Sequence, residues 1–302
     1  MILTKVKTLA LETRPHFLLL TPVCVFLGIS SALYHGYFNP MHALLVLVGS
    51  VFAHASVNVF NDYYDYVKKT DLFTKRTPFS GGSGFLPAGI LTPKETFALA
   101  VALMIAGGAI GVYFSIIYPV LIPLILLGAI MVWAYTPILT RVVVTEVFPG
   151  LGFGLMVIGS YITMLPPGSV VIHKTPVASA VLAGILISNL LFLNEFPDYE
   201  ADLKTGRRHM VIVLGKRRAS KVYVLLIAAA YVWVAASILC KALPLTSALS
   251  FLTIPIAAKA CSGCLRNYDN TEKLIPSMAR NVLVVLLTPV LLAIGLLLSK
   301  LI

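Results

Sequence analysis

Residues 41–66 read MHALLVLVGSVFAHASVNVFNDYYDY, an apolar run that ends in carboxylate and carboxamide side chains. A second apolar run, residues 175–193, leads into the sequence NEFPDYEAD at residues 194–202. Carboxylates inside or beside a membrane are costly and are therefore typical of functional sites. The two runs predict membrane-spanning helices that carry polar chemistry at one end.

The composition extends this prediction to the whole chain. Of 302 residues, 59% are hydrophobic and 12% are charged, whereas about 25% are charged in an ordinary soluble domain. A bilayer core of roughly 30 Å needs about 20 apolar residues in a helix. We therefore predict a single all-α, polytopic membrane domain over residues 1–302. Its nine expected transmembrane helices are 16–34, 41–66, 94–115, 119–138, 144–165, 175–197, 219–240, 242–264 and 277–300. Residues 1–14 lack the apolar core of a signal peptide and are expected to stay with the protein.

The net charge of +11 could indicate a nucleic-acid partner, but its distribution favours a membrane topology. Nine alternating helices place most Lys and Arg residues on one side, at the N-terminus and after the second, fourth, sixth and eighth helices. By the positive-inside rule this side is cytoplasmic. We therefore expect a multi-pass protein of the cell membrane, with its N-terminus inside, its C-terminus outside and no nucleic-acid partner. All twelve acidic residues fall on the same side, which predicts a site at the cytoplasmic face.

The two polar runs also indicate an internal repeat. Each ends an even-numbered helix, so the second and sixth helices run in the same direction. This predicts two four-helix halves around a central cavity, plus a ninth helix, with the two polar helix ends facing each other.

In the first run, Asn58, Asn61, Asp62 and Asp65 are spaced i, i+3, i+4 and i+7, which is one face of a helix. Asp71 follows one or two turns later.

In the second run, Asn194, Asp198 and Asp202 are spaced i, i+4 and i+8, with Glu195 beside that face. Pro197 is expected to kink the helix or end its regular pairing near residues 193–196.

Hard oxygen ligands of this kind suit Mg²⁺, which is usually held by carboxylates, waters and substrate phosphates. Lysines and arginines beside both runs would help to neutralise a bound diphosphate. No histidine-rich or Cys/His cluster is apparent, so zinc or iron is not expected. Alternatively, the aspartates and glutamates of the two runs bind no metal. They would then only form ion pairs in a solvated region at the membrane interface, with Lys68, Lys69, Lys204 and Arg207. Carboxylates of an ion transporter would instead be expected near the membrane midplane.

Two further features leave alternatives open. Gly81, Gly82, Gly84 and Gly89 lie in a loop that could bind an anion through backbone N–H groups or serve as a flexible connector. Residues 261–264 form a CxxC without a second pair, which favours structural cysteines over a zinc site or a disulfide framework.

Taken together, these residues resemble the UbiA superfamily of intramembrane prenyltransferases. Asn58-xxx-Asp62 with Asp65 matches the family's first motif, and Asp198-xxx-Asp202 matches its second. Arg14-Pro15, the sequence YTP at residues 135–137 and the sequence DLKTGRR at residues 202–208 are also similar to the family. The form NDYYDY with a following GGSG loop is most similar to the branch that prenylates 1,4-dihydroxy-2-naphthoate for menaquinone. Two departures are the lysine at position 69, where the family has a further acid, and Asn194, where many members have Asp.

The resemblance implies a mechanism and a set of site residues. Asp62, Asp65, Asp198 and Asp202 would be the catalytic residues and would bind two Mg²⁺ ions. The substrate-binding residues would be Arg14, Asn58, Lys68, Tyr135 and Asn194. The metal ions would polarise an allylic isoprenyl diphosphate, of geranyl to geranylgeranyl length or longer, until its C–O bond breaks. A lipophilic acceptor, most simply an aromatic quinone precursor, would then attack the allyl cation.

Other functions remain as alternatives. Within the same chemistry, the acceptor could be geranylgeranylglyceryl phosphate, as in ether-lipid synthesis. From different classes, a CDP-alcohol phosphotransferase also uses aspartates and Mg²⁺, but its D-G-x-x-A-R run is absent from the sequence. A secondary transporter would show coupled flux without release of diphosphate.

Overall fold

A computed structural model describes residues 2–70, 73–74 and 76–301, and every regular element in these residues is helical. The α-helices are α1 Ile2–Glu12, α2 Pro15–Leu18, α3 Leu20–Tyr34, α4 Pro40–Val67, α5 Pro93–Ile117, α6 Ile122–Ala134, α7 Val147–Ile162, α8 Lys174–Lys204, α9 Met210–Leu214, α10 Lys216–Leu239, α11 Ile254–Asn267 and α12 Thr271–Leu298. Three 3-10 helices are η2 Pro119–Leu121, η3 Leu139–Arg141 and η4 Leu245–Thr253. The all-α prediction is confirmed.

In the described part of the chain, fewer helices are long enough to span a membrane than the nine expected from the sequence. Within the described ranges, seven helical segments are long and apolar enough to cross a membrane. The expected fourth and fifth helices are shorter apolar helices, Pro119–Ala134 and Val147–Ile162. Helix α8 continues through Pro197 to Lys204, so the helix does not end at this proline; the alternative expectation, a kink, stays a prediction. The structure therefore supports a multi-pass membrane protein but not the exact count of nine.

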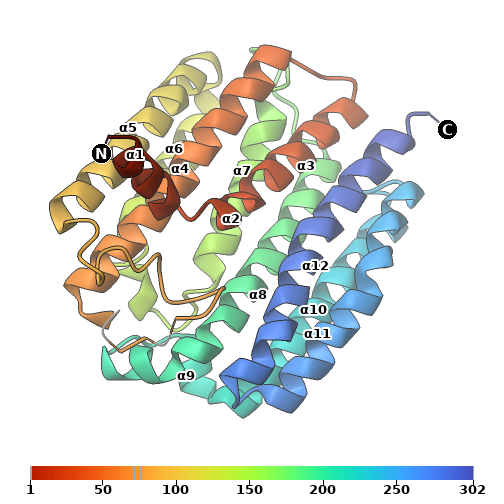
Figure 1. Ribbon diagram of the computed structural model, residues 1–302. Coiled ribbons are helices and arrows are strands. Elements are labelled where there is room, and N and C mark those ends of the chain that lie inside the picture. Colours follow the sequence, from red (N-terminus) through yellow and green to blue (C-terminus); the bar gives the residue numbers. More distant parts are fainter. Residues whose placement is uncertain (1, 71–72, 75, 302) are drawn as a thin grey trace.

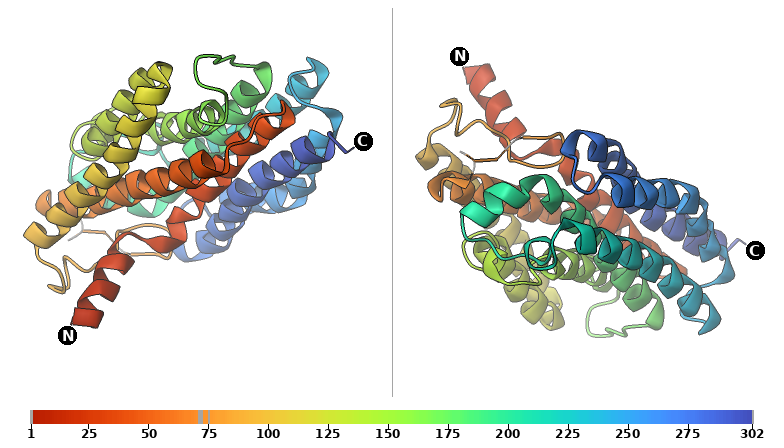
Figure 2. Two further views of the ribbon diagram at one scale, coloured as in Figure 1. Left: turned by 90° about the horizontal axis from the view of Figure 1, so that it is seen from above. Right: turned by 90° about the horizontal axis from the view of Figure 1, so that it is seen from below.

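The long helices form one bundle, with α4–α7 on one side, α10–α12 on the other and α8 between them (Figure 1). The bundle closes because α12 packs against α3 as well as against α8 and α11. Helix α1 lies at the edge of the bundle and points away from it (Figure 2). The main apolar core joins α3, α7 and α8 to α10, α11 and α12.

Short polar caps fix where several helices begin. Asn39 accepts a hydrogen bond from the backbone N–H of His42 at the start of α4. Thr92 and Glu95 form a capping box at the start of α5. Such caps satisfy backbone N–H groups that have no partner within the helix. The polar loops between spans are thereby tied to defined helix ends.

Small residues allow α7 to pack closely on two neighbours. A Cβ atom on Gly28 of α3 would lie 2.4 Å from the carbonyl oxygen of Val157 in α7. A Cβ atom on Gly150 of α7 would lie 2.4 Å from the carbonyl oxygen of Gly184 in α8. Close approach at small residues is a main source of helix association within membranes. These contacts hold α7 and α8 in place beside the polar end of the bundle.

Candidate active site

The polar face predicted for α4 is present and reaches a cavity. Asn58, Asn61 and Asp65 lie on the cavity wall, while Asp62 is buried beneath the glycine-containing loop that follows α4. The amide of Asn61 donates to Asp65 Oδ2 over 3.1 Å. Asn58 Nδ2 donates to the carbonyl oxygen of Thr13 over 3.0 Å. The helical spacing therefore presents two acids and two amides to one region.

The second polar face, on α8, lines the same cavity. Asn194, Asp198 and Asp202 all contribute to its wall. The Oδ1 atoms of Asn194 and Asp198 are buried without a hydrogen-bond partner. A buried polar atom without a partner is costly, so these oxygens are suited to bind a ligand from the cavity.

Arg207, which follows α8, joins the two polar faces. Its Nη1 lies 3.0 Å from Asp202 Oδ1, and its Nη2 forms an ion pair with Asp65 of α4. Burial alone would lower the pKa of Arg207, but the carboxylates of Asp65 and Asp202 outweigh it and raise the pKa. The guanidinium thus stays charged and contacts an aspartate that lies 142 positions earlier in the chain.

Arg14 plays a similar part beside Asn61 and Asp62 of α4. Its backbone is in the left-handed region, with φ 55°, at the junction between α1 and α2. Its Nη2 donates to Asn61 Oδ1 over 3.1 Å, and it forms an ion pair with Asp62. Both groups of aspartates therefore have a partly buried arginine beside them.

The glycine-containing loop covers Asp62. The backbone N–H of Ser83 donates to Asp62 Oδ2 over 2.9 Å, and the Ser83 hydroxyl donates to Glu12 Oε2 over 2.5 Å. Burial raises the pKa of Glu12, although the hydrogen bond from Ser83 opposes this. Gly82 has φ 71°, and a Cβ atom there would lie 3.0 Å from Asp62 Oδ1. The loop needs glycine to approach the aspartate this closely.

Tyr135 and Lys68, both predicted to bind substrate, are placed differently. Tyr135 lies on the cavity wall. The Lys68 ammonium donates to the carbonyl oxygens of Thr136 and Pro137, over 2.9 and 3.1 Å. Burial, then Arg141 and Arg207, lowers the pKa of Lys68. In this arrangement Lys68 holds the end of α6 against α4 and does not line the cavity.

The cavity itself has a volume of about 490 Å³, within the usual range for small-molecule sites. Its lining extends from Arg14 to His209 and so involves the N-terminal helices and α8. Away from the aspartates its wall is apolar, with contributions from Val46, Phe114, Leu121, Leu124 and Ile125. The arrangement suits a ligand with a polyanionic head and a long apolar tail.

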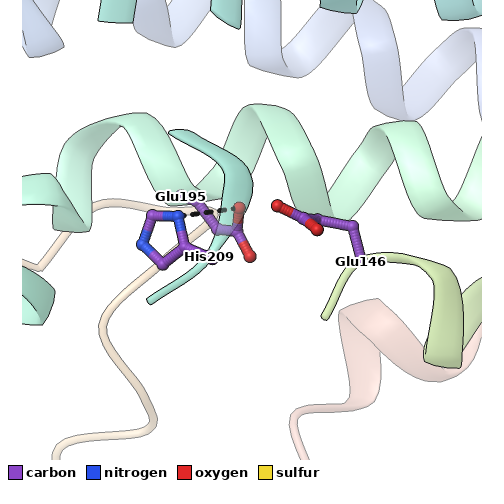
Figure 3. A group of neighbouring side chains, drawn as sticks. All are labelled: Glu146, Glu195 and His209. Atoms are coloured by element: carbon purple, nitrogen blue, oxygen red, sulfur yellow. Dashed lines mark ion pairs between the residues drawn. The ribbon is translucent and has the colours of Figure 1, made fainter. Parts of the chain in front are cut away.

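One neighbouring group of side chains was not expected from the sequence. Glu146, Glu195 and His209 place ligand-type atoms within 4.8 Å of one another, and all three are buried (Figure 3). The sequence analysis considered only histidine-rich and Cys/His clusters, whereas here a single histidine of the basic loop, His209, lies beside two glutamates. No local spacing relates Glu146 to His209, so the sequence held no signal for this group.

The structure brings together most of the predicted site residues. Arg14, Asn58, Tyr135 and Asn194 lie around the cavity with the four motif aspartates or directly beside them, while Lys68 lies outside its wall. Asp71 lies outside the described residues. Glu12 was not predicted as part of the site, since its link through Ser83 depends on the loop conformation.

Comparisons with known proteins agree with this geometry. The model of the UbiA prenyltransferase family matches residues 19–283. A relative from Bacillus subtilis (strain 168), 1,4-dihydroxy-2-naphthoate octaprenyltransferase, is 27% identical over 260 residues, which is 84% of this chain and 81% of the relative. Among solved structures, a UbiA homolog from Aeropyrum pernix K1 in its apo state matches with a TM-score of 0.71 at 16% identity, over 93% of this chain and 98% of the other. A UbiA homolog from Archaeoglobus fulgidus bound to GPP and Mg²⁺ matches with a TM-score of 0.60 at 18% identity, over the same shares.

Proposed function

Because the chain belongs to the UbiA prenyltransferase family, it is a prenyltransferase, and we propose that it transfers an isoprenyl chain from an allylic diphosphate to an aromatic quinone precursor. The precursor would be of the 1,4-dihydroxy-2-naphthoate type, as the name of the Bacillus subtilis relative indicates. One observation carries the proposal. Carboxylates from α4 and α8 meet at Arg207, at one end of an otherwise apolar cavity.

The four motif aspartates fit a divalent metal. Their donors are hard carboxylate oxygens, and the Oδ1 atom of Asp198 is buried without a partner. We assign Asp62 and Asp65 to one Mg²⁺ ion and Asp198 and Asp202 to another. Bound Mg²⁺ would supply charge neutralisation for the departing diphosphate.

The two arginines would hold the diphosphate. Arg14 and Arg207 now neutralise aspartates across the cavity end. With a metal bound at the aspartates, their guanidinium groups would donate to phosphate oxygens, for which their planar fork is well matched. The backbone N–H of Ser83, which donates to Asp62 Oδ2, would keep Asp62 oriented.

The apolar part of the cavity would protect the reaction from water. An allyl cation formed beside the aspartates is destroyed by water, so exclusion of solvent is part of catalysis. Phe114, Leu121 and Ile125 provide apolar walls for the isoprenyl tail. The ring of Tyr135 lies on the same wall and would stabilise positive charge through its face.

The charge distribution gives the orientation. The loops that carry most Lys and Arg residues would face the cytoplasm, with the N-terminus inside and the C-terminus outside. The diphosphate would then enter the cavity from the cytoplasmic side. Cysteine labelling of the exposed loop around Arg208, in sealed cells and in permeabilised cells, tests this orientation.

The activity itself is tested with purified protein. With geranylgeranyl diphosphate and 1,4-dihydroxy-2-naphthoate, pyrophosphate release should require Mg²⁺ and yield a prenylated ring. Asp62→Ala and Asp198→Ala should abolish turnover, while Glu200→Gln, a change at an exposed acid on the same helix as Asp198, should not. Full activity in both aspartate variants would contradict the assignment. Pyrophosphate release with geranylgeranylglyceryl phosphate but not with the naphthoate would transfer the proposal to ether-lipid synthesis.

A further inference from the structure

The cluster of Glu146, Glu195 and His209 has no part in the mechanism above. Its members come from three separate elements: the turn before α7, the last third of α8 and the segment that leads into α9 (Figure 3). Their exposed fractions are 3%, 7% and 2%. Two carboxylates of like sign this deep in a protein are costly unless a positive partner is present.

Each member of the cluster has an atom without a hydrogen-bond partner. These buried atoms are Glu146 Oε2, Glu195 Oε2 and His209 Nδ1. His209 Nδ1 lies 3.2 Å from Glu195 Oε2. Two ligands of a tetrahedral ion with bonds of about 2.0–2.1 Å are separated by about 3.3 Å, so this spacing suits a shared ion.

The remaining polar atoms of His209 and Glu146 form the hydrogen bonds that are typical behind metal ligands. His209 Nε2 lies 3.1 Å from Asp202 Oδ2, so an Nε2 proton would be donated to this carboxylate and Nδ1 would be left as a ligand. The backbone N–H of Met210 donates to Glu146 Oε1 over 3.0 Å, which leaves Oε2 directed at the cluster. A carboxylate behind the histidine and a hydrogen bond behind the ligating carboxylate are the usual outer contacts of a metal site.

We propose that Glu146, Glu195 and His209 bind a borderline divalent cation such as Zn²⁺ or Mn²⁺, at a site distinct from the motif aspartates. One imidazole and two carboxylates suit such ions, whereas Mg²⁺ prefers oxygen ligands alone. Glu195 and His209 also line the cavity, which gives the ion a route of entry and room for a water ligand. The ion would tie the start of α7 to α8 and α9, and it would fix His209 against Asp202.

The wild-type protein gives a direct test by itself. Full-length protein in detergent is stripped with a chelator and titrated with Mn²⁺ in the absence of any diphosphate. Pulsed electron paramagnetic resonance should show ¹⁴N coupling from a bound imidazole. Absence of this coupling at saturating Mn²⁺ would overturn the proposal and leave two carboxyl groups that share a proton.

Variants then assign the coupling to this cluster, because the chain has six histidines. His209→Gln should remove the ¹⁴N signal, and Glu195→Gln should weaken Mn²⁺ binding at this site by tenfold or more. Glu200→Gln, which removes an exposed carboxylate from the same helix, should leave both unchanged.

A double variant separates this site from the proposed catalytic one. Asp62→Asn with Asp198→Asn should keep the ¹⁴N coupling although prenyl transfer is lost. Loss of the coupling in this double variant would show that the imidazole signal belongs to the aspartate site, and would refute the assignment. Retention of the ¹⁴N coupling in the His209→Gln variant would also refute the assignment.

Discussion

Replacement of Arg207 by methionine tests whether the two polar helix ends are held together by this one guanidinium. The side chain is 17% exposed and contacts carboxylates of Asp65 and Asp202 that are 12% and 3% exposed. Hydrogen bonds to charged groups contribute about 1.5–3 kcal/mol each. Removal of one partner from a buried ion pair costs about 3–5 kcal/mol, because the remaining charge is left uncompensated. We therefore expect Arg207→Met to lower the free energy of unfolding by about 3–5 kcal/mol.

The measurement is an SDS titration in mixed micelles, followed by circular dichroism. Arg208→Met is the matched control: it removes the same charge from the next residue, which is exposed, and should change the free energy of unfolding by less than about 0.5 kcal/mol. Addition of Asp65→Asn to Arg207→Met should restore about 1–3 kcal/mol, because one uncompensated carboxylate is then removed. Equal stability of the Arg207→Met and Arg208→Met variants would refute the bridging role.

Three further perturbations follow from individual positions. Gly82→Ala should raise the KM for the diphosphate about tenfold in a pyrophosphate-release assay, since φ 71° and a Cβ 3.0 Å from Asp62 Oδ1 force the loop to move; an unchanged KM would contradict this. Gly28→Ala should destabilise the protein by about 1–3 kcal/mol in SDS titration, because its Cβ would overlap a carbonyl oxygen of α7, whereas Gly108→Ala, with open space around its Cβ, should not. Burial, then the charges of a neighbouring histidine and a lysine, lowers the pKa of His35 to about 4. The folded state then binds fewer protons than the unfolded state, so stability should be full above pH 6.5 and fall from pH 6.5 to 4. The thermal midpoint should show this fall, and His35→Phe should reduce it.

Much of the site could be predicted because its main residues are local to two helices. The i, i+3, i+4, i+7 spacing places Asn58, Asn61, Asp62 and Asp65 on one face of any straight helix. The structure keeps that face, and α8 presents Asn194, Asp198 and Asp202 in the same way. The long apolar stretches of sequence between the polar loops likewise predict the transmembrane helices, since a helix needs a long apolar segment to cross a bilayer.

Other features depend on the ends of helices and on how they pack. The expected fourth and fifth helices are shorter apolar helices, and α8 continues through Pro197. A proline is tolerated within a transmembrane helix where its surroundings can satisfy the freed backbone groups, and the local sequence does not specify those surroundings. The resemblance assigned Lys68 to substrate binding, and that role stays a prediction. In the structure its ammonium donates to carbonyl oxygens just beyond α6, a contact that no local pattern encodes.

The sequence by itself therefore determined the class of the molecule and its two oxygen-rich helix faces, because hydrophobic length and helical period are local properties. Only the tertiary structure decided which charges neutralise those faces. It placed Arg207 between α4 and α8, and it gathered Glu146, Glu195 and His209 into one buried cluster. These contacts join residues far apart in the chain, and their energies arise only when burial removes water from around the charges.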